Sequence, residues 1–190
     1  MSRQVSVFLL LSILSANSLS DWDRQISSRL EGSNKNILFD ISMESFSLVT
    51  PVIEWSSIYQ SWVKDRSSMN YEIATLGLLT TYSLVGITKY VIGRKRPERN
   101  YTPRLWNTRL TPSFPSGHTA SSAMWATTLF PNKHFLSLSY VALSAWSQVY
   151  VGNHYVSDVL SGAIVGTLIG KIISSKYSKD LGNPPTSINI

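Results

Sequence analysis

Long apolar stretches separated by short polar segments dominate this chain of 190 residues. They cover residues 46–63, 74–92, 117–130, 135–151 and 157–174. The second is mostly apolar over its whole length, which as a helix measures about 28 Å and nearly matches the roughly 30 Å hydrocarbon layer of a bilayer. The pattern therefore predicts an all-α protein, a membrane-embedded helical bundle of about five or six helices.

The N-terminal part of the chain has a different pattern. An arginine precedes an apolar run over residues 5–14, and small residues follow as far as Ser20. Residues 1–20 are thus typical of a signal peptide, and a short first membrane helix is the alternative. Residues 21–45 mix apolar and charged side chains, which predicts an amphipathic helix lying at the membrane interface.

Three glycines at four-residue spacing, Gly162, Gly166 and Gly170, lie in the last apolar stretch. This spacing puts small residues on one side of a helix, where a second helix can approach closely. The chain becomes polar after Lys176. The predicted organisation is a signal peptide or first membrane helix over residues 1–20, a helical domain over 21–176 and a polar tail over 177–190.

Composition supports a membrane setting. Only 15% of the residues are charged, against about a quarter in soluble domains. The absence of cysteine excludes a disulfide framework and a thiolate site. Much of the net charge of +6 comes from one basic cluster, and no nucleic-acid recognition helix or aromatic-basic sheet accompanies it. Its members are Arg94, Lys95, Arg96, Arg99, Arg104 and Arg109.

The distribution of positive charge predicts an orientation. If Asp21 lies outside the membrane, the short loops at Lys64 and Lys133 lie inside, where lysine and arginine are preferred. The basic segment over 94–109 then falls outside, against this preference, which indicates that it binds an anion. We therefore expect a bacterial-type inner-membrane protein with its site on the periplasmic or outer face.

The first candidate for chemistry is the pair His154 and Asp158, which follows the turn-forming Gly152-Asn153. Residues four apart lie on one face of a helix. A carboxylate there can accept from one ring nitrogen and leave the other free to act as a base or nucleophile. A helix cap with a surface pair is the other interpretation of the same spacing.

The second candidate is Pro115-Ser116-Gly117-His118, at the start of an apolar stretch. Ser116 in this place is typical of a helix N-cap. The same helix start presents unpaired N–H groups that can bind a phosphate. His118 beside it could then protonate a leaving oxygen.

The third candidate is Lys89 with Arg96-Pro97, seven residues further on. A lysine at the end of a membrane helix often only extends its charge to the interface. As phosphate ligands, Lys89 would supply a point charge and Arg96 a planar fork of donors.

Taken in series, these segments resemble the three-part signature of the type 2 phosphatidic acid phosphatase family, which includes lipid phosphatases, bacterial acid phosphatases and vanadium haloperoxidases. The resemblance covers residues 89–158 in order and with the family's spacings. Its parts are Lys89 with Arg96-Pro97, then Pro115 to His118, then Ser147-Gln148 with His154 and Asp158.

The resemblance implies a set of roles. His154 would attack phosphorus and form a phosphohistidine, Asp158 would orient its ring, and His118 would protonate the leaving oxygen. No metal or other cofactor is implied. The phosphate-binding residues would be Lys89, Arg96, Ser116, Gly117 and Gln148.

Gln148 departs from the signature, because the family usually has arginine immediately after the serine. A hydrogen bond to a charged group contributes about 1.5–3 kcal/mol, so its loss would lower turnover about ten- to a hundredfold. The sequence thus predicts a membrane phosphatase of reduced rate acting on a lipid phosphomonoester or pyrophosphate. Phosphatidic acid, phosphatidylglycerol phosphate, undecaprenyl pyrophosphate and lipid A phosphates are candidate substrates, and the oligomeric state stays open.

Two alternatives follow from the same residues. A secreted soluble acid phosphatase would carry the same signature without the bilayer. A non-catalytic binder of lipid phosphates would keep the cationic residues and lose the chemistry, with Gln148 as the mark of that loss.

Overall fold

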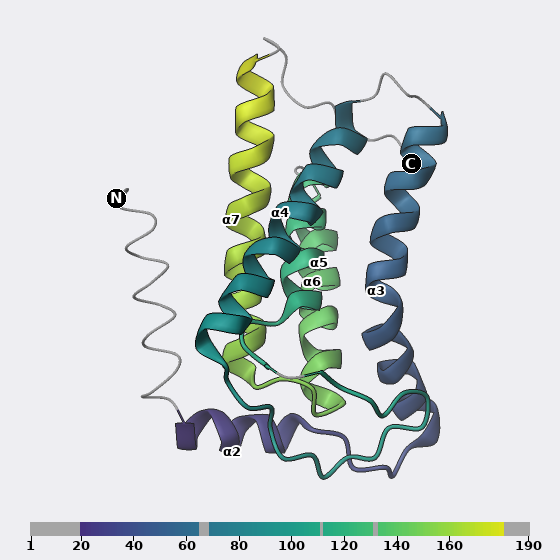
Figure 1. The fold of residues 1–190 in the computed structure, drawn as a ribbon. Coiled ribbons are helices and arrows are strands. Elements are labelled where there is room, and N and C mark those ends of the chain that lie inside the picture. Colours follow the sequence, from purple (N-terminus) through teal and green to yellow (C-terminus); the bar gives the residue numbers. More distant parts are fainter. Residues whose placement is uncertain (1–19, 65–68, 111, 131–132, 181–190) are drawn as a thin grey trace.

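The computed structural model describes residues 20–64, 69–110, 112–130 and 133–180. This part of the chain is all-helical, as predicted, and the elements stand side by side except for α2, which lies across one end (Figure 1). The six helices are α2 Ser20–Leu30, α3 Ile37–Lys64, α4 Met69–Ile92, α5 Gly117–Leu129, α6 His134–Tyr150 and α7 Val156–Asp180.

The short helix α5 is the centre of the bundle. Nine of its thirteen residues are buried, and it packs against α3, α4, α6 and α7. Because it has neighbours on every side, small residues fill most of its length, and Met124 and Trp125 supply the larger core contacts. The main cluster around it consists of Ile58, Ala74, Leu78, Met124, Trp125, Ala126, Leu129, Val165 and Ile169.

The predicted glycine face of α7 is confirmed, and it lies against α5. A Cβ atom at Gly162 would come within 2.5 Å of the carbonyl oxygen of Ser116, and one at Gly170 within 3.0 Å of that of Met124. A Cβ at Gly166 would overlap the carbonyl oxygen of Ala120. The two backbones therefore touch along three successive helical turns, as small residues allow in membrane bundles.

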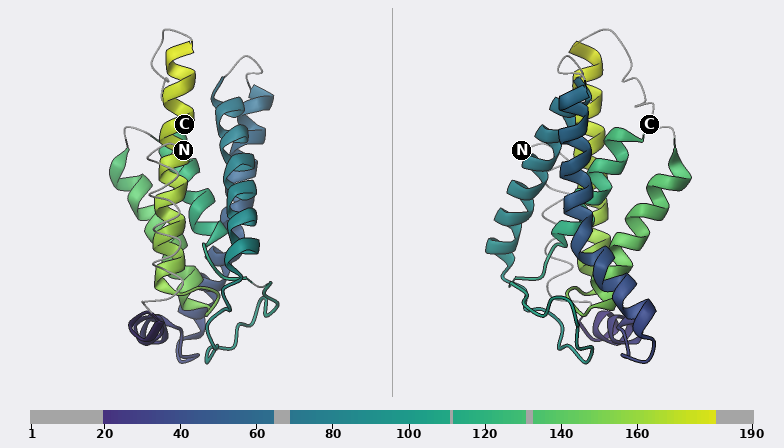
Figure 2. Two further views of the ribbon diagram at one scale, coloured as in Figure 1. Left: turned by 60° about the vertical axis from the view of Figure 1, so that its left-hand side comes forward. Right: turned by 90° about the vertical axis from the view of Figure 1, so that its right-hand side faces the viewer.

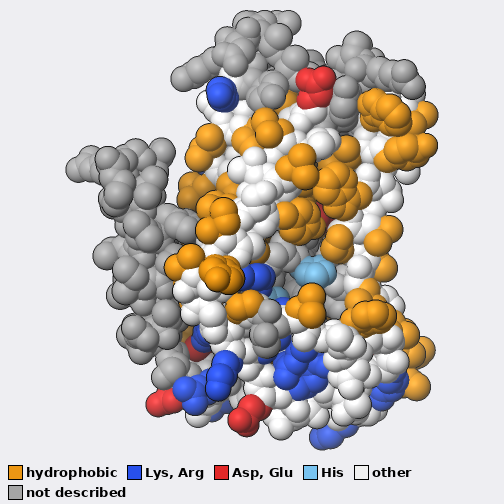
Figure 3. Space-filling model, in the orientation of Figure 1, with side chains coloured by type: hydrophobic (Ala, Val, Ile, Leu, Met, Phe, Trp, Pro, Cys, Tyr) orange, Lys and Arg blue, Asp and Glu red, His pale blue; other side chains and the backbone are white. Residues whose placement is uncertain are grey.

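Helix α3 buries its polar side and exposes its apolar side. Asp40, Glu44 and Glu54 are almost fully buried, whereas Val52 is 63% exposed. Large apolar side chains are exposed along α4, α6 and α7 as well, and they cover the sides of the bundle in Figure 3. Lys and Arg side chains gather instead at the end where α2 lies. An apolar belt around polar interior groups is the arrangement that a lipid solvent favours.

The predicted interfacial helix over residues 21–45 is wrong in its extent. Helix α2 ends at Leu30, a turn follows, and residues 37–45 belong to the long helix α3. In the connection, Asn34 adopts a positive φ of 58°, which is incompatible with a continuous helix. The side chain of Asn36 accepts the N–H of Phe39 and caps the start of α3. Amphipathic character continues across the break, so hydrophobic pattern alone could not locate it.

Two of the described helices are long and apolar enough to cross a membrane, over Glu72–Ile92 and Val156–Lys176. Helices α5 and α6, with 13 and 17 residues, are shorter than a typical span. Helix α7 reaches Asp180, beyond the predicted start of the polar tail at residue 177. The predicted signal peptide or first membrane helix over 1–20 lies almost entirely outside the described residues.

The basic loop between α4 and α5 is fixed to α3 by buried carboxylates. Glu44 accepts the N–H groups of Arg104 and Leu105 at 2.8 and 2.6 Å. Asp40 accepts from the Arg104 guanidinium at 3.0 Å and from the Tyr150 hydroxyl at 2.6 Å. Figure 2 shows this loop and α2 at the same end of the bundle from two further directions.

Candidate active site

The structure brings the three predicted motifs together at the loop end of the bundle. The N–H of Ser116, before α5, donates to the carbonyl oxygen of Asp158 in the first turn of α7 at 2.9 Å. An Arg96 Nη1 atom lies 3.3 Å from Nε2 of His154. Segments separated by up to sixty residues in the sequence thus share one site.

His154 lies in the loop before α7, two residues ahead of the helix. Gly152, with a φ of +65°, turns the chain there, and the carbonyl oxygen of Gln148 accepts the N–H groups of Asn153 and His154 at 3.0 and 3.3 Å. The predicted pair with Asp158 is formed, with Nδ1 of the ring 3.4 Å from Oδ2. Asp158 also accepts the N–H of Tyr155 at 2.9 Å, which caps α7.

Burial keeps the His154 ring neutral. The side chain is 3% exposed, and burial, assisted by the charges of Arg96 and Lys89 and opposed by Asp158, lowers its pKa to about 4. At neutral pH the contact with Asp158 is therefore a long hydrogen bond from Nδ1–H. Nε2 is then the unprotonated nitrogen, which accepts from Arg96 Nη1 at 3.3 Å. When Arg96 binds an anion instead, the Nε2 lone pair can act as a nucleophile toward that electrophile.

Two cations that are held by backbone oxygens, Arg96 and Lys89, act electrostatically on this ring. Lys89 Nζ donates to the carbonyl oxygens of Pro112 and Ser113, both at 2.9 Å. Arg96 donates to the carbonyl oxygens of Leu110 and Asn153. Burial and the nearby Arg109 and Arg99 lower the pKa of Arg96 to about 10, which still leaves it charged at neutral pH.

Neither Lys89 nor Arg96 forms an ion pair with a carboxylate in the described part of the chain. Two further guanidinium groups approach the loop at Gly152 and Asn153. Arg99 donates to the Asn153 side chain at 2.6 Å, and Arg109 donates to the carbonyl oxygen of Gly152. Positive charge without a matching carboxylate favours a bound anion at this loop.

The second motif begins α5 beside these cations. Ser116 is fully buried and caps the helix, its Oγ accepting from the N–H of Thr119 at 3.4 Å. Gly117 is not tightly enclosed, since a Cβ there would only touch Val85 at 3.6 Å. His118 is half-buried, and its ring and that of His154 both interact electrostatically with Arg96 and Lys89.

Gln148 is engaged with protein partners. Its side chain is 1% exposed, its Nε2 donates to the carbonyl oxygen of Ser47 on α3 at 3.0 Å, and its Oε1 accepts from Asn153 at 3.1 Å. These bonds tie the loop that carries His154 to α3. A phosphate contact by Gln148 stays a prediction.

We expect Gln148→Leu to lower the free energy of unfolding by about 2–4 kcal/mol, because it leaves the buried carbonyl oxygen of Ser47 and the half-buried amide of Asn153 without these partners. Thermal or denaturant unfolding in detergent measures this. Gln60→Leu, at an exposed glutamine of α3, is the matched control and should change stability by no more than about 0.5 kcal/mol. Equal stability of the two variants would contradict the role of Gln148 in holding the His154 loop against α3.

The sequence did not indicate two residues next to Asp158. Arg94 donates from Nη1 to Asp158 Oδ1 at 2.7 Å and from Nη2 to Asp23 Oδ2 at 2.6 Å. Arg94 belongs to the basic cluster, which we expect to bind an anion because it falls outside the membrane against the usual preference. Asp23 gave no local signal, since its partners lie 71 and 134 positions away in the sequence.

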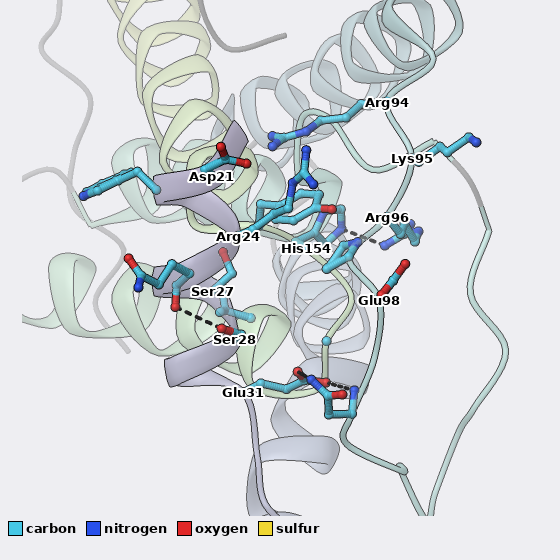
Figure 4. Close-up of a pocket in the computed structure, with 17 residues that line it drawn as sticks. Asp21, Arg24, Ser27, Ser28, Glu31, Arg94, Lys95, Arg96, Glu98 and His154 are labelled. Atoms are coloured by element: carbon cyan, nitrogen blue, oxygen red, sulfur yellow. Dashed lines mark hydrogen bonds between the residues drawn. The ribbon is translucent and has the colours of Figure 1, made fainter. Parts of the chain in front are cut away.

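A cleft opens beside His154 between α2 and the basic loop. Its volume is about 1010 Å³, and Figure 4 shows α2 along one wall, the loop with Lys95, Arg96 and Glu98 along the other, and His154 between them. Most of the residues that line it are polar or charged. In the described residues, no group of three or more His, Asp or Glu side chains is placed to hold a metal ion.

A sequence model of the PAP2 superfamily matches residues 71–181, more than half of the chain and all three motifs. The chain belongs to the PAP2 superfamily. This confirms the resemblance to the type 2 phosphatidic acid phosphatases. Asp23 and the rest of α2 precede the matched region.

Three relatives within the superfamily are phosphatases of lipid-linked substrates. The chain is 35% identical over 69 residues to the lipid A 4'-phosphatase of Porphyromonas gingivalis and 28% identical over 151 residues to the lipid A 1-phosphatase of that species. It is 30% identical over 112 residues to the decaprenylphosphoryl-5-phosphoribose phosphatase of Mycobacterium tuberculosis. The matches cover 34%, 70% and 58% of this chain and 29%, 30% and 63% of the relatives, so the chain spans less than two thirds of each.

Two crystal structures of superfamily members share the fold. The transmembrane PAP2-type phosphatidylglycerolphosphate phosphatase of Bacillus subtilis superposes with a TM-score of 0.68 at 22% identity, over 95% of this chain and 98% of that one. LpxE of Aquifex aeolicus gives a TM-score of 0.61 at 21% identity, over 78% and 92% of the two chains. The bundle is therefore the PAP2 fold.

Proposed function

We propose that this PAP2 protein is a membrane phosphatase that hydrolyses a lipid phosphomonoester or pyrophosphate through a phosphohistidine. The observation that carries the proposal is the environment of His154. Its Nδ1 faces Asp158 and its Nε2 faces Arg96. Within the described residues, neither Arg96 nor Lys89 forms an ion pair with a carboxylate. The relatives named as lipid phosphatases support a lipid substrate.

The reaction has two steps. In the first, Nε2 of His154 forms a bond to phosphorus as the bond from phosphorus to the leaving oxygen breaks. His118 gives that oxygen a proton, and it must be protonated in the substrate complex, where the charge of the phosphate offsets Arg96 and Lys89, because burial and these cations lower its pKa to about 4. In the second, His118 takes a proton from water, the water oxygen bonds to phosphorus, and the bond to Nε2 breaks to release inorganic phosphate. Asp158 stabilises the charged ring between the steps.

The cations stabilise the transition state. Lys89 and Arg96 would bind the phosphoryl oxygens, together with Ser116 and the N–H of Gly117 at the start of α5. Their charge and donors are fixed by the protein before the substrate arrives, so little reorganisation is needed. These groups supply the positive charge that phosphoryl transfer requires, and we expect activity to persist in EDTA.

The apolar belt and the two candidate spans support a place in the membrane. We propose a bacterial-type inner membrane with the site on the periplasmic or outer face, because the short connections at Lys64, after α3, and at Lys133, before α6, would then lie inside, where lysine and arginine are preferred. Extraction distinguishes this from a secreted acid phosphatase, which would appear in the periplasmic fraction without detergent.

The deciding experiment assays phosphate release by the purified protein from phosphatidic acid, phosphatidylglycerol phosphate, undecaprenyl pyrophosphate and a lipid A phosphate. We expect hydrolysis of at least one of them and inhibition by vanadate, which mimics five-coordinate phosphorus. Binding without hydrolysis of any of these lipids would favour the non-catalytic alternative. Activity gained only by Gln148→Arg would show a site that has lost its chemistry.

A further inference from the structure

Asp23 is a buried carboxylate on a helix that lies at the end of the bundle. It is 0% exposed, although its neighbours in the sequence on α2, Trp22 and Arg24, line the open cleft. Its Oδ1 accepts the N–H of Ser157 at 3.0 Å, and its Oδ2 accepts from the Ser157 hydroxyl and from Arg94. A charge withdrawn from water in this way needs such partners.

Arg94 connects this carboxylate to the one beside His154. Its two terminal nitrogens donate to different acids, Nη2 to Asp23 at 2.6 Å and Nη1 to Asp158 at 2.7 Å. Its guanidinium also lies over the ring of Tyr155, 4.1 Å from the centroid. A planar guanidinium group that is bound at both terminal nitrogens and on one face has a fixed orientation.

The direction of that fork determines how Asp158 faces His154. Arg94 occupies Oδ1 of Asp158, which turns Oδ2 toward the N–H of Tyr155 and toward Nδ1 of the histidine ring. The contact to the ring is long, at 3.4 Å, so a small rotation of the carboxylate would break it.

We propose that Asp23 is a positioning residue for His154, acting through Arg94 and Asp158. The inference rests on the proposed function and extends it to α2, which lies before the region matched by the superfamily model. The hydrogen bonds of Asp23 go to Arg94 and Ser157 and not to the ring of His154 or His118. It holds Arg94 in place so that the carboxylate of Asp158 keeps Nδ1 of His154 protonated and Nε2 free.

The docking of α2 does not depend on Asp23 alone. Ser27 accepts the N–H of Val156 at 2.9 Å, and Glu31 accepts the N–H groups of Asn100 and Tyr101 at 2.8 and 2.9 Å. A change confined to the charge of Asp23 should therefore leave α2 on the bundle and act on Arg94.

The test compares Asp23→Asn with the wild-type protein in kcat, KM and thermal unfolding, using whichever lipid phosphate the wild type hydrolyses. We expect kcat to fall about tenfold, the effect of one weakened hydrogen bond between charged groups. KM should stay within twofold, because the hydrogen bonds of Asp23 go to Arg94 and Ser157 and not to a proposed phosphate ligand. Arg29→Gln, which removes an exposed charge from the same helix, is the control and should leave kcat unchanged.

A second variant covers the case in which Asp23→Asn fails to fold. Arg94→Lys keeps the positive charge but cannot bridge two carboxylates in a fixed direction, so kcat should fall by a similar factor. Wild-type kcat in either folded variant, or a rise in KM with kcat unchanged, would overturn the proposal.

A spectroscopic signature separates this proposal from the proposed function. With ¹⁵N-labelled histidine, the wild-type NMR spectrum should show the His154 ring as a single tautomer, with a proton on Nδ1 and none on Nε2. In Asp23→Asn, the signals of both ring nitrogens should shift toward those of a mixture of tautomers. This comparison needs no turnover. If the wild type hydrolyses none of the lipids, the proposed function fails, and an unchanged His154 spectrum in Asp23→Asn would separately overturn the role of Asp23.

Discussion

We expect His154→Ala to abolish phosphate release, with kcat lowered on the order of 10⁴-fold, as when other covalent enzymes lose their nucleophile. The remaining site would still hold Lys89 and Arg96, so binding of the lipid phosphate should change far less than turnover. Steady-state kinetics on the best substrate and a separate binding measurement check the two parts of the prediction.

The control is His134→Ala, at the exposed start of α6, which should keep wild-type turnover. Rapid quenching with substrate labelled in the phosphoryl group should trap label on the wild-type protein and none on His154→Ala. Label retained by that variant, or turnover within tenfold of wild type, would show that another group attacks phosphorus.

The second large effect concerns folding. Gly166→Ala should destabilise the bundle by about 3 kcal/mol or more, the upper range for forced overpacking. The new methyl group would overlap the backbone carbonyl of Ala120 and approach the backbone nitrogen of Met124. Neither obstacle is a side chain that can rotate away, so α5 and α7 must separate. Thermal unfolding in detergent measures the loss.

Gly86→Ala provides a matched comparison on α4. Gly86 is also inside a helix, yet a Cβ there would meet nothing within 4 Å. The same substitution should stabilise the protein by about 0.5–1 kcal/mol, because alanine loses less backbone entropy than glycine in a helix. Equal destabilisation of both variants would mean that the close backbone contact between α5 and α7 is not the cause of the loss in stability.

The sequence predicted the parts of this protein that depend on local pattern. Apolar stretches located α4 to α7, and the four-residue spacing of Gly166 and its neighbours located the contact face. The motif spacings named His118, His154 and Asp158, and the structure brings their segments to one end of the bundle. Each of these signals is contained within a few helical turns of one segment.

What the sequence could not predict depends on distant partners. The boundary between α2 and α3 is set by the turn at Asn34, inside a continuous amphipathic pattern. Asp23 looks like any acidic residue at the start of a helix, and only the folded chain places it beside Arg94. Gln148 was considered for its place in a motif, whereas its bonds to Ser47 and Asn153 cross between helices.

The contact between α5 and α7 fixes the geometry of one side of the proposed site. Gly162 seats on the carbonyl oxygen of Ser116, so main-chain atoms alone set the separation of the helix starts that carry His118 and Asp158. No rotamer change can alter that separation. Differences in substrate size must then be met by the arginine-bearing loop, and we expect enzymes that share this architecture to diversify their specificity there.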